Sequence, residues 1–534
     1  MTTRAKPTLL ASLMLAGLWS LSSQASAACA AWDKATAYTQ GTVVSHNGAY
    51  YQSKWWTQNE VPGASPWGPW AASTKAACDA VPGGGTGGGG GGTGGGTGTL
   101  PPLPEPKPTV GAHSGSYFTQ WGIYGRNYRL RTLVDRGGDK KLTFLNYAFG
   151  NVYADGKCGI VTRTETGNGD GGDGYADYQK SFAAAESVDG VADKWDDKLR
   201  GNFGQLRKLK LRNPDLKLLI SLGGWTWSKN FSKAASTDAG RKTLVSSCID
   251  LYIKGNLPTG ENAGGPGVLA TVFDGIDIDW EYPVAGGLPT NGYSAADKQN
   301  FSLLMAEFRA QLDALGTANK RKYYLTAAVG AGVDKIRNTE VAVYAKSLDW
   351  VNVMTYDFNG AWNATGPTNF QSHLYRDPAA PATGDTQFYT VNDAVQTMVQ
   401  AGMPRAKINV GIPFYGRGWK GVKPGAANNG LYQAATGAGA GTYEAGIEDY
   451  KVLKTRTAAK VYYHPVTMQL WTYDGNEFWS YDDPTVIRTK IKYVKDQQLG
   501  GLFSWSLDGD DAQNTLLNAQ WEVRGATPVV KSAK

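Results

Sequence analysis

Acidic residues recur at every second position of one short apolar stretch, Phe273-Asp274-Gly275-Ile276-Asp277-Ile278-Asp279-Trp280-Glu281-Tyr282. Because side chains alternate across a β-strand, Asp277, Asp279 and Glu281 share one face and the bulky apolar side chains share the other. Acids two residues apart lie about 6–7 Å apart at Cα, so that one raises the pKa of the next. Such an arrangement keeps a carboxylic acid protonated near neutral pH, as glycoside hydrolysis requires.

Two other interpretations of this stretch are a calcium site and an acidic surface strand. A calcium loop needs oxygen ligands on a curved, glycine-bearing turn, whereas the alternation here is that of a strand. A solvated strand would not place bulky apolar groups so regularly opposite the acids. The pattern therefore favours catalysis by the acids.

The amino-terminal segment has the features of a secretory signal peptide. A basic start is followed by an apolar run over residues 9–21 and by Ala25-Ser26-Ala27, which predicts cleavage after Ala27. The run is too short for a membrane-spanning helix. A lipoprotein anchor at Cys29 is disfavoured because Ser26 stands three positions before it. We expect an exported protein with no membrane segment.

Four cysteines are few for an exported chain of 534 residues, so the fold must depend on its core. Cys29 and Cys78 bracket a small aromatic segment, and oxidising surroundings favour their pairing. Cys158 and Cys248 form a second bridge only if their side chains meet, which sequence does not decide.

Composition excludes several other classes of protein. The four histidines are scattered and there is no Cys-x-x-Cys motif, so neither a metal centre nor a cofactor is expected. The 53 basic residues stand against 46 acidic ones without a basic run, so nucleic-acid binding is not indicated. The 18 Trp and 28 Tyr residues offer many flat faces of the kind that hold sugar rings.

A glycine- and threonine-rich stretch divides the chain. Residues 81–99 form a flexible coil, and the following proline-rich residues 101–108 predict an extended spacer. The predicted organisation is a signal peptide (1–27), a small module (28–80), a linker (81–112), a large domain (113–528) and a tail (529–534).

The large domain alternates strand and helix patterns such as those of Lys298–Leu315 and Val391–Gln400. Apolar parallel strands separated by helices predict either an α/β barrel or a doubly wound sheet, and eight repeats favour a (β/α)8 TIM barrel. The eight candidate strands are Phe118–Gly125, Leu142–Gly150, Leu216–Gly223, Gly275–Glu281, Tyr323–Val329, Trp350–Phe358, Ile408–Tyr415 and Gly501–Leu507.

The carboxyl ends of these strands are rich in aromatic and charged residues, where a barrel places its chemistry. A single aromatic residue at a strand end usually belongs to the core, but repetition on most strands indicates a site. The strand-end candidates are Trp121, Tyr124, Phe149, Trp225, Glu281, Tyr356, Asp357, Tyr415, Arg417 and Trp505.

One gap breaks the rhythm of the repeats. About 85 residues separate Tyr415 from Gly501, and Asp483–Gln498 has the pattern of the helix that precedes the last strand. Residues 418–482 are therefore an insertion with short aromatic strands. At the active face of a barrel it would raise one wall of a cleft.

With these residues considered, the large domain resembles secreted chitinases of glycoside hydrolase family 18 over nearly all of residues 116–525. Asp274-x-x-Asp277-x-Asp279-x-Glu281 matches the acidic signature of the family at every acid. Ser221-Leu-Gly-Gly224, Met354-Thr-Tyr-Asp357 and Ser504-Trp505 match its other strand-end motifs. The insertion resembles the small α+β domain found in one branch of the family.

The resemblance implies retention by substrate-assisted catalysis, an exception to the usual carboxylate nucleophile. Glu281 would be the acid and then the base, Asp279 would hold the acetamido group, and Asp277 would share a proton with Asp279. Tyr356 would donate to the acetamido oxygen and Asp357 would position the distorted sugar. Asp274, out of phase with these acids, has a supporting or a purely structural role.

Further residues are implied to bind substrate. Trp505 would form the floor under the sugar at the cleavage point, and glucose polymers, which lack the acetamido group, should not be cleaved. The full expected substrate-binding set is Trp505, Tyr415, Arg417, Met354, Trp121, Tyr124, Phe149, Trp225 and Tyr282.

The amino-terminal module resembles a small all-β chitin-binding domain of the family 5 and 12 type. Trp32, the run from Tyr38 to Val43, Gly48-Ala-Tyr50-Tyr51, Lys54-Trp55-Trp56-Thr57 and Pro62-Gly63 carry the resemblance. We expect Trp55, Trp56 and Tyr51 to contact chitin, although which of the adjacent tryptophans faces the ligand stays open. The alternative is a disulfide-stapled spacer.

The leading hypothesis is a secreted, monomeric chitinase that acts on chitin and N-acetylglucosamine oligomers. An endo-β-N-acetylglucosaminidase on glycoprotein glycans is the second hypothesis, disfavoured by the module. A chitin-binding lectin on an inactive barrel is the third, disfavoured because Glu281 is present.

Overall fold

The computed structural model describes residues 30–38, 42–54, 57–64, 69–79 and 100–525 of the chain. These fall into two compact units, residues 1–96 and 97–534. The pairing of Cys29 with Cys78, the signal peptide, the tail and the contacts of Trp55 and Trp56 lie outside the described residues.

The larger unit is a closed barrel of eight parallel strands. In sheet order these run β11-β14-β15-β16-β17-β24-β6-β7, and β7 pairs with β11 again to close the circle. Their bounds are β6 His113–Thr119, β7 Phe144–Val152, β11 Lys217–Gly223, β14 Gly275–Asp279, β15 Tyr324–Gly330, β16 Trp350–Met354, β17 Ile408–Pro413 and β24 Gly501–Trp505. The (β/α)8 prediction is confirmed.

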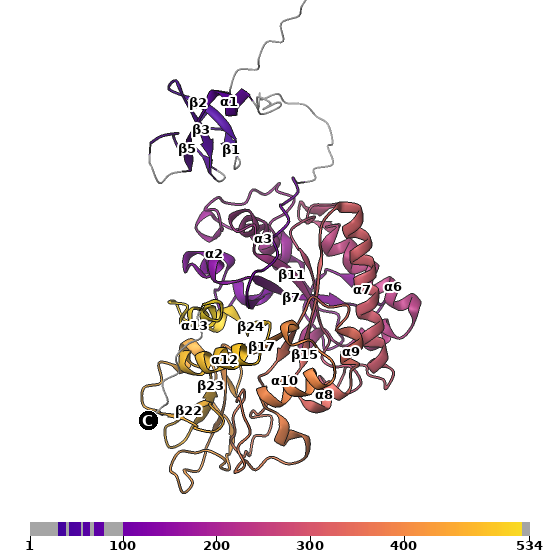
Figure 1. Ribbon diagram of the computed structural model, residues 1–534, viewed down its shortest axis with the longest axis vertical. Helices are drawn as coiled ribbons and strands as arrows, with labels where there is room; N and C mark the ends of the chain where they lie inside the picture. Colours follow the sequence, from indigo (N-terminus) through magenta and orange to yellow (C-terminus); the bar gives the residue numbers. More distant parts are fainter. Residues whose placement is uncertain (1–29, 39–41, 55–56, 65–68, 80–99, 526–534) are drawn as a thin grey trace, which may run out of the picture. The chain divides into compact units, whose positions relative to one another are not determined.

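Helices follow the strands and cover the outside of the barrel. Figure 1 shows α6, α7 and α9 on one flank, with α12 and α13 on the other. The helices are α2 Leu130–Asp135, α3 Gly201–Arg212, α4 Gly224–Trp227, α5 Phe231–Ala235, α6 Asp238–Cys248, α7 Asp297–Asn319, α8 Val333–Arg337, α9 Val341–Tyr344, α10 Val391–Gln400, α12 Pro484–Asp496 and α13 Thr515–Trp521.

The strands are buried on both faces, which explains their nearly continuous apolar sequences. One apolar cluster fills the space between strands and helices, with members such as Leu218, Ile276 and Phe308. A second, more aromatic cluster fills the barrel interior and includes Tyr117, Tyr356 and Phe503. The aromatic interior reaches the carboxyl ends of the strands and so becomes part of the site.

The insertion after β17 is a separate layer built on a six-stranded sheet. Its strands are β18 Tyr415–Lys420, β19 Gly437–Ala438, β20 Ile447–Asp449, β21 Lys460–Tyr463, β22 Leu470–Tyr473 and β23 Phe478–Tyr481, with the short helix α11 Tyr450–Leu453. It has its own apolar core around Trp419, Trp471 and Phe478. The sheet starts at Tyr415, so Tyr415 and Arg417 stand on the insertion rather than on the seventh barrel strand.

One expectation about the amino-terminal part of the barrel differs from the structure. The first strand ends at Thr119, and Trp121 belongs to the 3-10 turn η1, Gln120–Ile123, rather than to the strand. The proline-rich residues predicted to form an extended spacer have no helix or strand, and part of this segment packs on the barrel. Leu103 is 3% exposed, its N–H donates to Thr271 Oγ1 at 2.7 Å, and its carbonyl accepts from Arg321 at 2.8 Å. The buried side chain of Leu103 and its two backbone hydrogen bonds fix this segment on the barrel.

The disulfide left open by the sequence is present between Cys158 and Cys248. It joins the β7–β8 hairpin, in which β8 is Cys158–Gly159, to the last residue of α6.

The smaller unit contains a three-stranded antiparallel sheet of β2 Val43–His46, β3 Ala49–Ser53 and β5 Trp70–Ser73. The two-residue strands β1 Ala37–Tyr38 and β4 Thr57–Gln58 pair separately, and α1 Lys75–Asp79 follows β5. Tyr38, Val44 and Trp70 form its core, and the half-buried Tyr51 packs against them. Its core is small, as expected for a module of this length.

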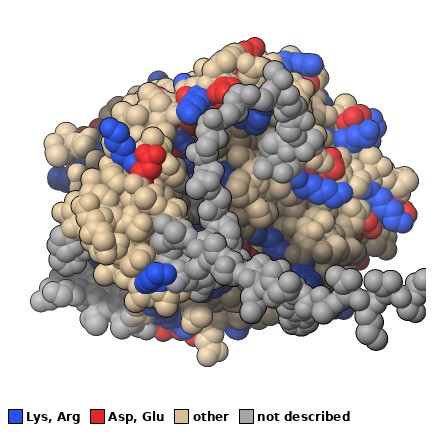
Figure 2. Space-filling model, turned by 90° about the horizontal axis from the view of Figure 1, so that it is seen from above, with Lys and Arg blue, Asp and Glu red and all other residues tan. Residues whose placement is uncertain are grey.

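On the face shown in Figure 2, Lys and Arg side chains are interspersed with Asp and Glu side chains. Among the residues that the structure describes, no helix combines the length and the apolar character needed to cross a membrane.

Candidate active site

The predicted acids stand at the carboxyl end of β14, at the centre of the barrel mouth. Asp277 and Asp279 lie within the strand, and Glu281 follows two residues after its end. All three side chains are buried. No salt bridge reaches any of them from another described residue.

Asp277 is held by hydroxyl groups from three other strands. Its Oδ2 accepts from the hydroxyls of Tyr117 and Ser221, at 2.8 and 2.9 Å, and its Oδ1 accepts from Thr326 Oγ1. Ser221 and Thr326 are its register partners on β11 and β15, so the sheet itself delivers them. Burial raises the pKa of Asp277, and these hydrogen bonds oppose the shift.

Asp279 is in a different environment two residues further on. Its Oδ1 is buried without a hydrogen-bond partner among the described residues. Burial, followed by the charges of Glu281 and Asp277, raises the pKa of Asp279 well above its ordinary value. Asp279 is thus a buried carboxyl group whose raised pKa favours the protonated form and whose Oδ1 makes no hydrogen bond to a described residue.

Glu281 has the properties of a general acid. Burial raises its pKa to about 7, with a further contribution from Asp357 and an opposing one from the Tyr282 hydroxyl. Its carboxyl group is therefore substantially protonated near neutral pH.

The backbone around Glu281 is fixed from two sides. Its N–H donates to Ser228 Oγ at 2.8 Å, and its carbonyl accepts from Asn291 Nδ2 at 2.9 Å. The Ser228 hydroxyl also lies 2.8 Å from the carbonyl of Gly224 and 3.1 Å from that of Asp279. Ser228 thus ties the end of β14 to the segment that follows β11.

Gly223, in the glycine pair at the end of β11, lets the backbone of this segment pass close to the end of β14. Gly223 has φ +106°, and a Cβ there would lie 2.4 Å from the carbonyl oxygen of Asp279. Only glycine permits both this conformation and this close approach.

Tyrosine and arginine residues surround the acids. Tyr356 is buried, and burial together with Asp279 and the other acids raises its pKa well above the ordinary value, so its hydroxyl stays a donor. Asp357 Oδ1 accepts from Tyr415 at 2.8 Å and from Arg417 Nε at 2.7 Å. Burial opposes the charged form of Arg417, but Asp357 raises its pKa and keeps it cationic.

Aromatic rings line the floor of the site. Trp505 stacks on Phe149 with ring centroids 5.5 Å apart and an interplanar angle of 16°, and Trp121 follows at 6.3 Å from Trp505. Met354 packs against the same interior cluster. Trp225, on α4, is half exposed. The rings of Trp121, Phe149 and Trp505 form a connected, partly exposed surface of the kind on which sugars stack.

A cavity of about 480 Å³ lies between Asp357 and Trp505, at the barrel strand ends, and the insertion. Asp357 and Trp505 line one end, while Trp121 and Tyr124 line the wall formed by the loop after β6. The insertion contributes Tyr443, whose ring lies 4.3 Å from the guanidinium carbon of Arg126. The expectation that the insertion raises one wall of the site agrees with this geometry.

Three residues of the site were not among the sequence candidates. Trp362 is 61% exposed and lies 5.1 Å from the Arg417 guanidinium carbon. Tyr443 and Arg126 close the far end of the cavity through a bond from the Tyr443 hydroxyl to the Gly125 carbonyl and an ion pair between Arg126 and Asp449. Trp362 lies in a loop after the strand-end motif and Tyr443 in a loop of the insertion, so strand-end reasoning did not reach them. Arg126 stands only two residues after Tyr124, but it is not aromatic and was not selected with it.

Asp274 lies at the opposite end of β14 from the other acids. Its carboxylate is fully buried and pairs with Lys210 and, at 2.7 Å, with Arg321. It also accepts from the Leu218 N–H at 2.9 Å. Of the two roles considered, the contacts support the structural one.

No cluster of three or more His, Cys, Asp or Glu side chains among the described residues has the geometry to hold a metal ion.

A barrel with paired carboxyls at the end of its fourth strand defines a class of glycoside hydrolases. Residues 114–510 match the family model of glycosyl hydrolases family 18, and the chain belongs to this family. Residues 31–71 match carbohydrate-binding module family 5/12.

Individual relatives agree with this assignment. Chitinase C of Streptomyces lividans is 42% identical over 420 residues, covering 78% of this chain and 60% of the relative, so the chain spans less than two thirds of that protein. The catalytic domain of psychrophilic chitinase B from Arthrobacter TAD20 has a TM-score of 0.75 at 44% identity, covering 79% of this chain and 98% of that one. A family 18 N-acetylglucosaminidase from Paenibacillus barengoltzii has a TM-score of 0.58 at 30% identity, with coverage of 77% and 99%.

Proposed function

We propose that this protein is a chitinase that hydrolyses β-1,4-linked N-acetylglucosamine with retention of configuration. The observation that carries the proposal is the pair of buried carboxyls, Asp279 and Glu281, whose raised pKa values are not offset by any cation contact from the described residues. Names of relatives at 42% and 44% identity support the substrate.

In the proposed mechanism Glu281 protonates the glycosidic oxygen, and the acetamido oxygen of the same substrate attacks C1. The bond between C1 and the leaving oxygen breaks, and an oxazolinium ion forms. Asp279, with its unpartnered Oδ1, binds the acetamido N–H and, as its proton passes toward Asp277, stabilises the developing positive charge. Glu281 then removes a proton from the water that opens the ring.

The surrounding residues position the sugar. The Tyr356 hydroxyl donates to the acetamido oxygen, and Asp357, held by Tyr415 and Arg417, contacts the distorted ring. Trp505, supported by Phe149, forms the floor beneath it. Met354, Trp121, Tyr124, Trp225 and Tyr282 complete the proposed substrate contacts.

The amino-terminal module is proposed to bind chitin and so to keep the barrel near its substrate. The match to a carbohydrate-binding family supports this role. Tyr51 is half-buried against the module core, so only part of its ring is available to a ligand. Export is proposed from the pattern of residues 1–27, and amino-terminal sequencing of the mature protein should start at Ala28.

The test of the proposed function is a timed product profile on chitohexaose, with cellohexaose alongside. We expect N-acetylglucosamine oligomers released in the β-configuration and no cleavage of cellohexaose. Cleavage of both substrates would show that the nucleophile is misassigned, and cleavage of neither would overturn the proposed function. Release of single N-acetylglucosamine units alone would favour the activity named for the Paenibacillus neighbour.

A further inference from the structure

A long excursion between β7 and α3, residues 153–200, passes beside the aromatic wall of the cavity. It contains the strand β10, Gly172–Asp173, and the short helical turn η3, Tyr175–Gln179. The turn packs against η1, the segment that carries Trp121. Two carboxylates of this excursion, Asp173 and Asp177, point at the two ends of η1.

Asp173 holds Tyr124, which follows η1. The Tyr124 hydroxyl donates to Asp173 Oδ2 at 2.8 Å, while Asp173 Oδ1 accepts from the Ala176 N–H at 2.9 Å. Asp173 is itself fixed on the hairpin by pairing with Thr162. Tyr124 is 47% exposed, so this hydrogen bond at its tip restrains a ring that the solvent otherwise leaves free to rotate.

Asp177 holds the other end of η1. Its buried Oδ1 accepts from Gln120 Nε2 and from the Tyr147 hydroxyl, both at 2.6 Å. Asn202 Nδ2 donates to the Gln120 carbonyl at 3.2 Å and to the Tyr147 hydroxyl at 3.1 Å. Gln120 is thus fixed at side chain and backbone, which sets the position of the next residue, Trp121.

Groups outside the cavity therefore help to hold the exposed rings of Trp121 and Tyr124, in addition to the contacts of Trp121 with Phe149 and Trp505. A ring that is already oriented loses less conformational freedom when a sugar stacks on it, so binding is tighter without any new contact. Neither Asp173 nor Asp177 lines the cavity.

We propose that Asp173 and Asp177 are positioning residues for sugar binding, acting through Tyr124 and through Gln120 on Trp121. The inference rests on the proposed function of the cleft. It concerns substrate affinity along the cavity and not the chemical step, because neither carboxylate contacts Asp279, Glu281 or the hydroxyls around them.

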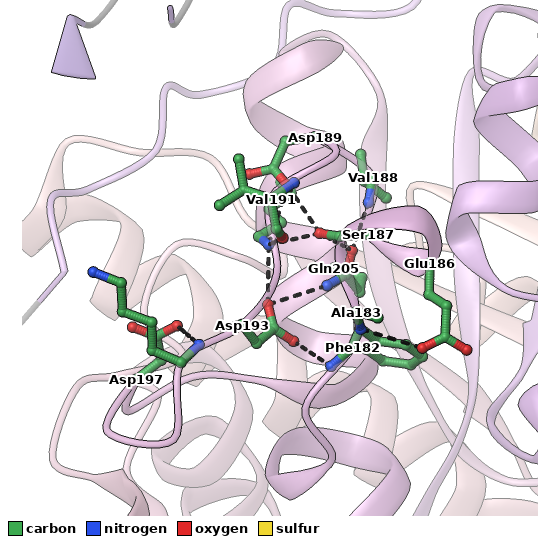
Figure 3. Close-up of polar contacts among 12 residues, drawn as sticks. Phe182, Ala183, Glu186, Ser187, Val188, Asp189, Val191, Asp193, Asp197 and Gln205 are labelled. Carbon is green, nitrogen blue, oxygen red and sulfur yellow. Dashed lines mark hydrogen bonds and ion pairs between the residues drawn. The ribbon is translucent and has the colours of Figure 1, made fainter. Parts of the chain in front are cut away.

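The same excursion offers a matched control. The Asp193 side chain is 3% exposed, and its carboxylate accepts from the Phe182 N–H at 2.9 Å and pairs with Lys208 at 3.0 Å. Figure 3 shows it beside Gln205 of α3, in a group that also includes Ser187. These contacts hold the excursion against α3, and none of them involves a residue that lines the cavity.

The experiment uses the full-length protein with Asp173→Ala, Asp177→Ala and Asp193→Ala. For chitohexaose we expect KM to rise about five- to tenfold in the first two variants, with kcat within about twofold of wild type. With a chitobioside that carries an aryl leaving group, KM should change by less than about twofold, because its two sugars lie at and next to Glu281. Asp193→Ala should leave both KM values unchanged.

Partner substitutions keep the test decisive if an aspartate variant does not fold. Tyr124→Phe and Gln120→Met remove the same hydrogen bonds from the other side, and each should raise KM for chitohexaose. Tyr124→Phe combined with Asp173→Ala should have no more effect than either alone.

The outcomes separate this inference from the proposed function. Wild-type cleavage of chitohexaose with unchanged KM in the variants would overturn the positioning role alone. Equal KM effects on both substrates, or the same effect in Asp193→Ala, would show a general disturbance of the fold and also overturn it. Absence of wild-type cleavage would instead reject the proposed function.

Discussion

The two ends of strand β14 both bury carboxylates, but the protein compensates them in opposite ways. At the first end, Asp274 is paired with the buried Lys210 and with Arg321 and accepts a backbone N–H. At the last end, Asp279 and Glu281 receive no cation from the described residues, and their pKa values rise instead. At the first end the buried acid is compensated by cations, whereas at the other end raised pKa values favour the protonated acids.

This difference separates stability from catalysis on a single strand. A buried ion pair whose remaining lone pairs are satisfied does not depend on pH near neutrality, but it has no proton to give. A buried acid without a cation is destabilising when ionised, and for that reason it is a proton donor near pH 7. The position of each acid agrees with the division of barrels into a stabilising bottom and a catalytic top.

The largest expected effect comes from removing the proton donor. Glu281→Gln should lower kcat on chitohexaose by about 10³-fold or more, because the leaving oxygen then departs without protonation. The protein should still bind chitin, since the amino-terminal module is untouched. Turnover within about tenfold of wild type would contradict the assignment of Glu281 as the acid.

The substitution Asp274→Ala, at the other end of the strand, should lower stability and leave turnover unchanged. Asp274→Ala leaves Lys210 buried without its partner, so we expect the free energy of unfolding to fall by about 3–5 kcal/mol in urea denaturation. The activity of the folded fraction should match wild type.

The exposed Asp215 provides the control for this change, since its one ion pair among the described residues is with the exposed Lys107, whose backbone N–H also donates to it. Asp215→Ala should alter stability by less than about 0.5 kcal/mol. A folded Asp274→Ala protein with impaired kcat would show that the two ends of β14 are not independent.

The comparison also predicts a stability difference that depends on pH. Because the pKa of Glu281 rises from 4.5 to about 7 on folding, the native state holds this proton more tightly than the unfolded chain. Its contribution to stability is therefore fully present below about pH 4.5 and is lost as pH rises through 7.

Glutamine cannot ionise, so Glu281→Gln should be more stable than wild type by up to about 3 kcal/mol at pH 8 and similar to wild type at pH 4. Denaturation curves of both proteins at the two pH values measure this. A difference that does not change with pH would contradict the raised pKa. The same titration should lower kcat/KM above pH 7, with an apparent pKa that belongs to Asp279 and Glu281 together.

Sequence periodicity was sufficient to predict the barrel and the acids, because both depend on local alternation. It failed for the first strand, predicted five residues too late. His113, Ser114 and Ser116 make this strand look polar, but they are paired inside the protein, Ser114 with the Lys141 carbonyl and Ser116 with Ser504. Hydrogen-bonding partners that are 27 and 388 residues away leave no local pattern.

The same limit explains the incomplete prediction of the cleft. Trp121 and Trp505 were found because they stand at or near strand ends, whereas Tyr443 joins the cavity only through a loop of the insertion. The sequence also did not predict that Asp274 would be paired with cations and Asp279 would not. Lys210 and Arg321 come from α3 and from the loop after α7, and only the fold brings them to one end of β14.

The smallest expected effect tests how the catalytic end of β14 is held in place without charges. Ser228→Ala removes the hydroxyl that accepts from the Glu281 N–H and bonds the carbonyls of Gly224 and Asp279. The Glu281 carbonyl still accepts from Asn291, so we expect the Glu281 carboxyl group to be displaced slightly and not to leave the site. We expect kcat to fall about tenfold, equivalent to about 1.4 kcal/mol, with KM nearly unchanged.

Ser228→Thr, which retains the hydroxyl, should recover part of the rate, and Ser236→Ala, at an exposed hydroxyl in the same region, is the control. If Ser228→Ala raised KM without lowering kcat, the hydroxyl would serve substrate binding, and the bond from Asn291 would be sufficient to hold the backbone of Glu281.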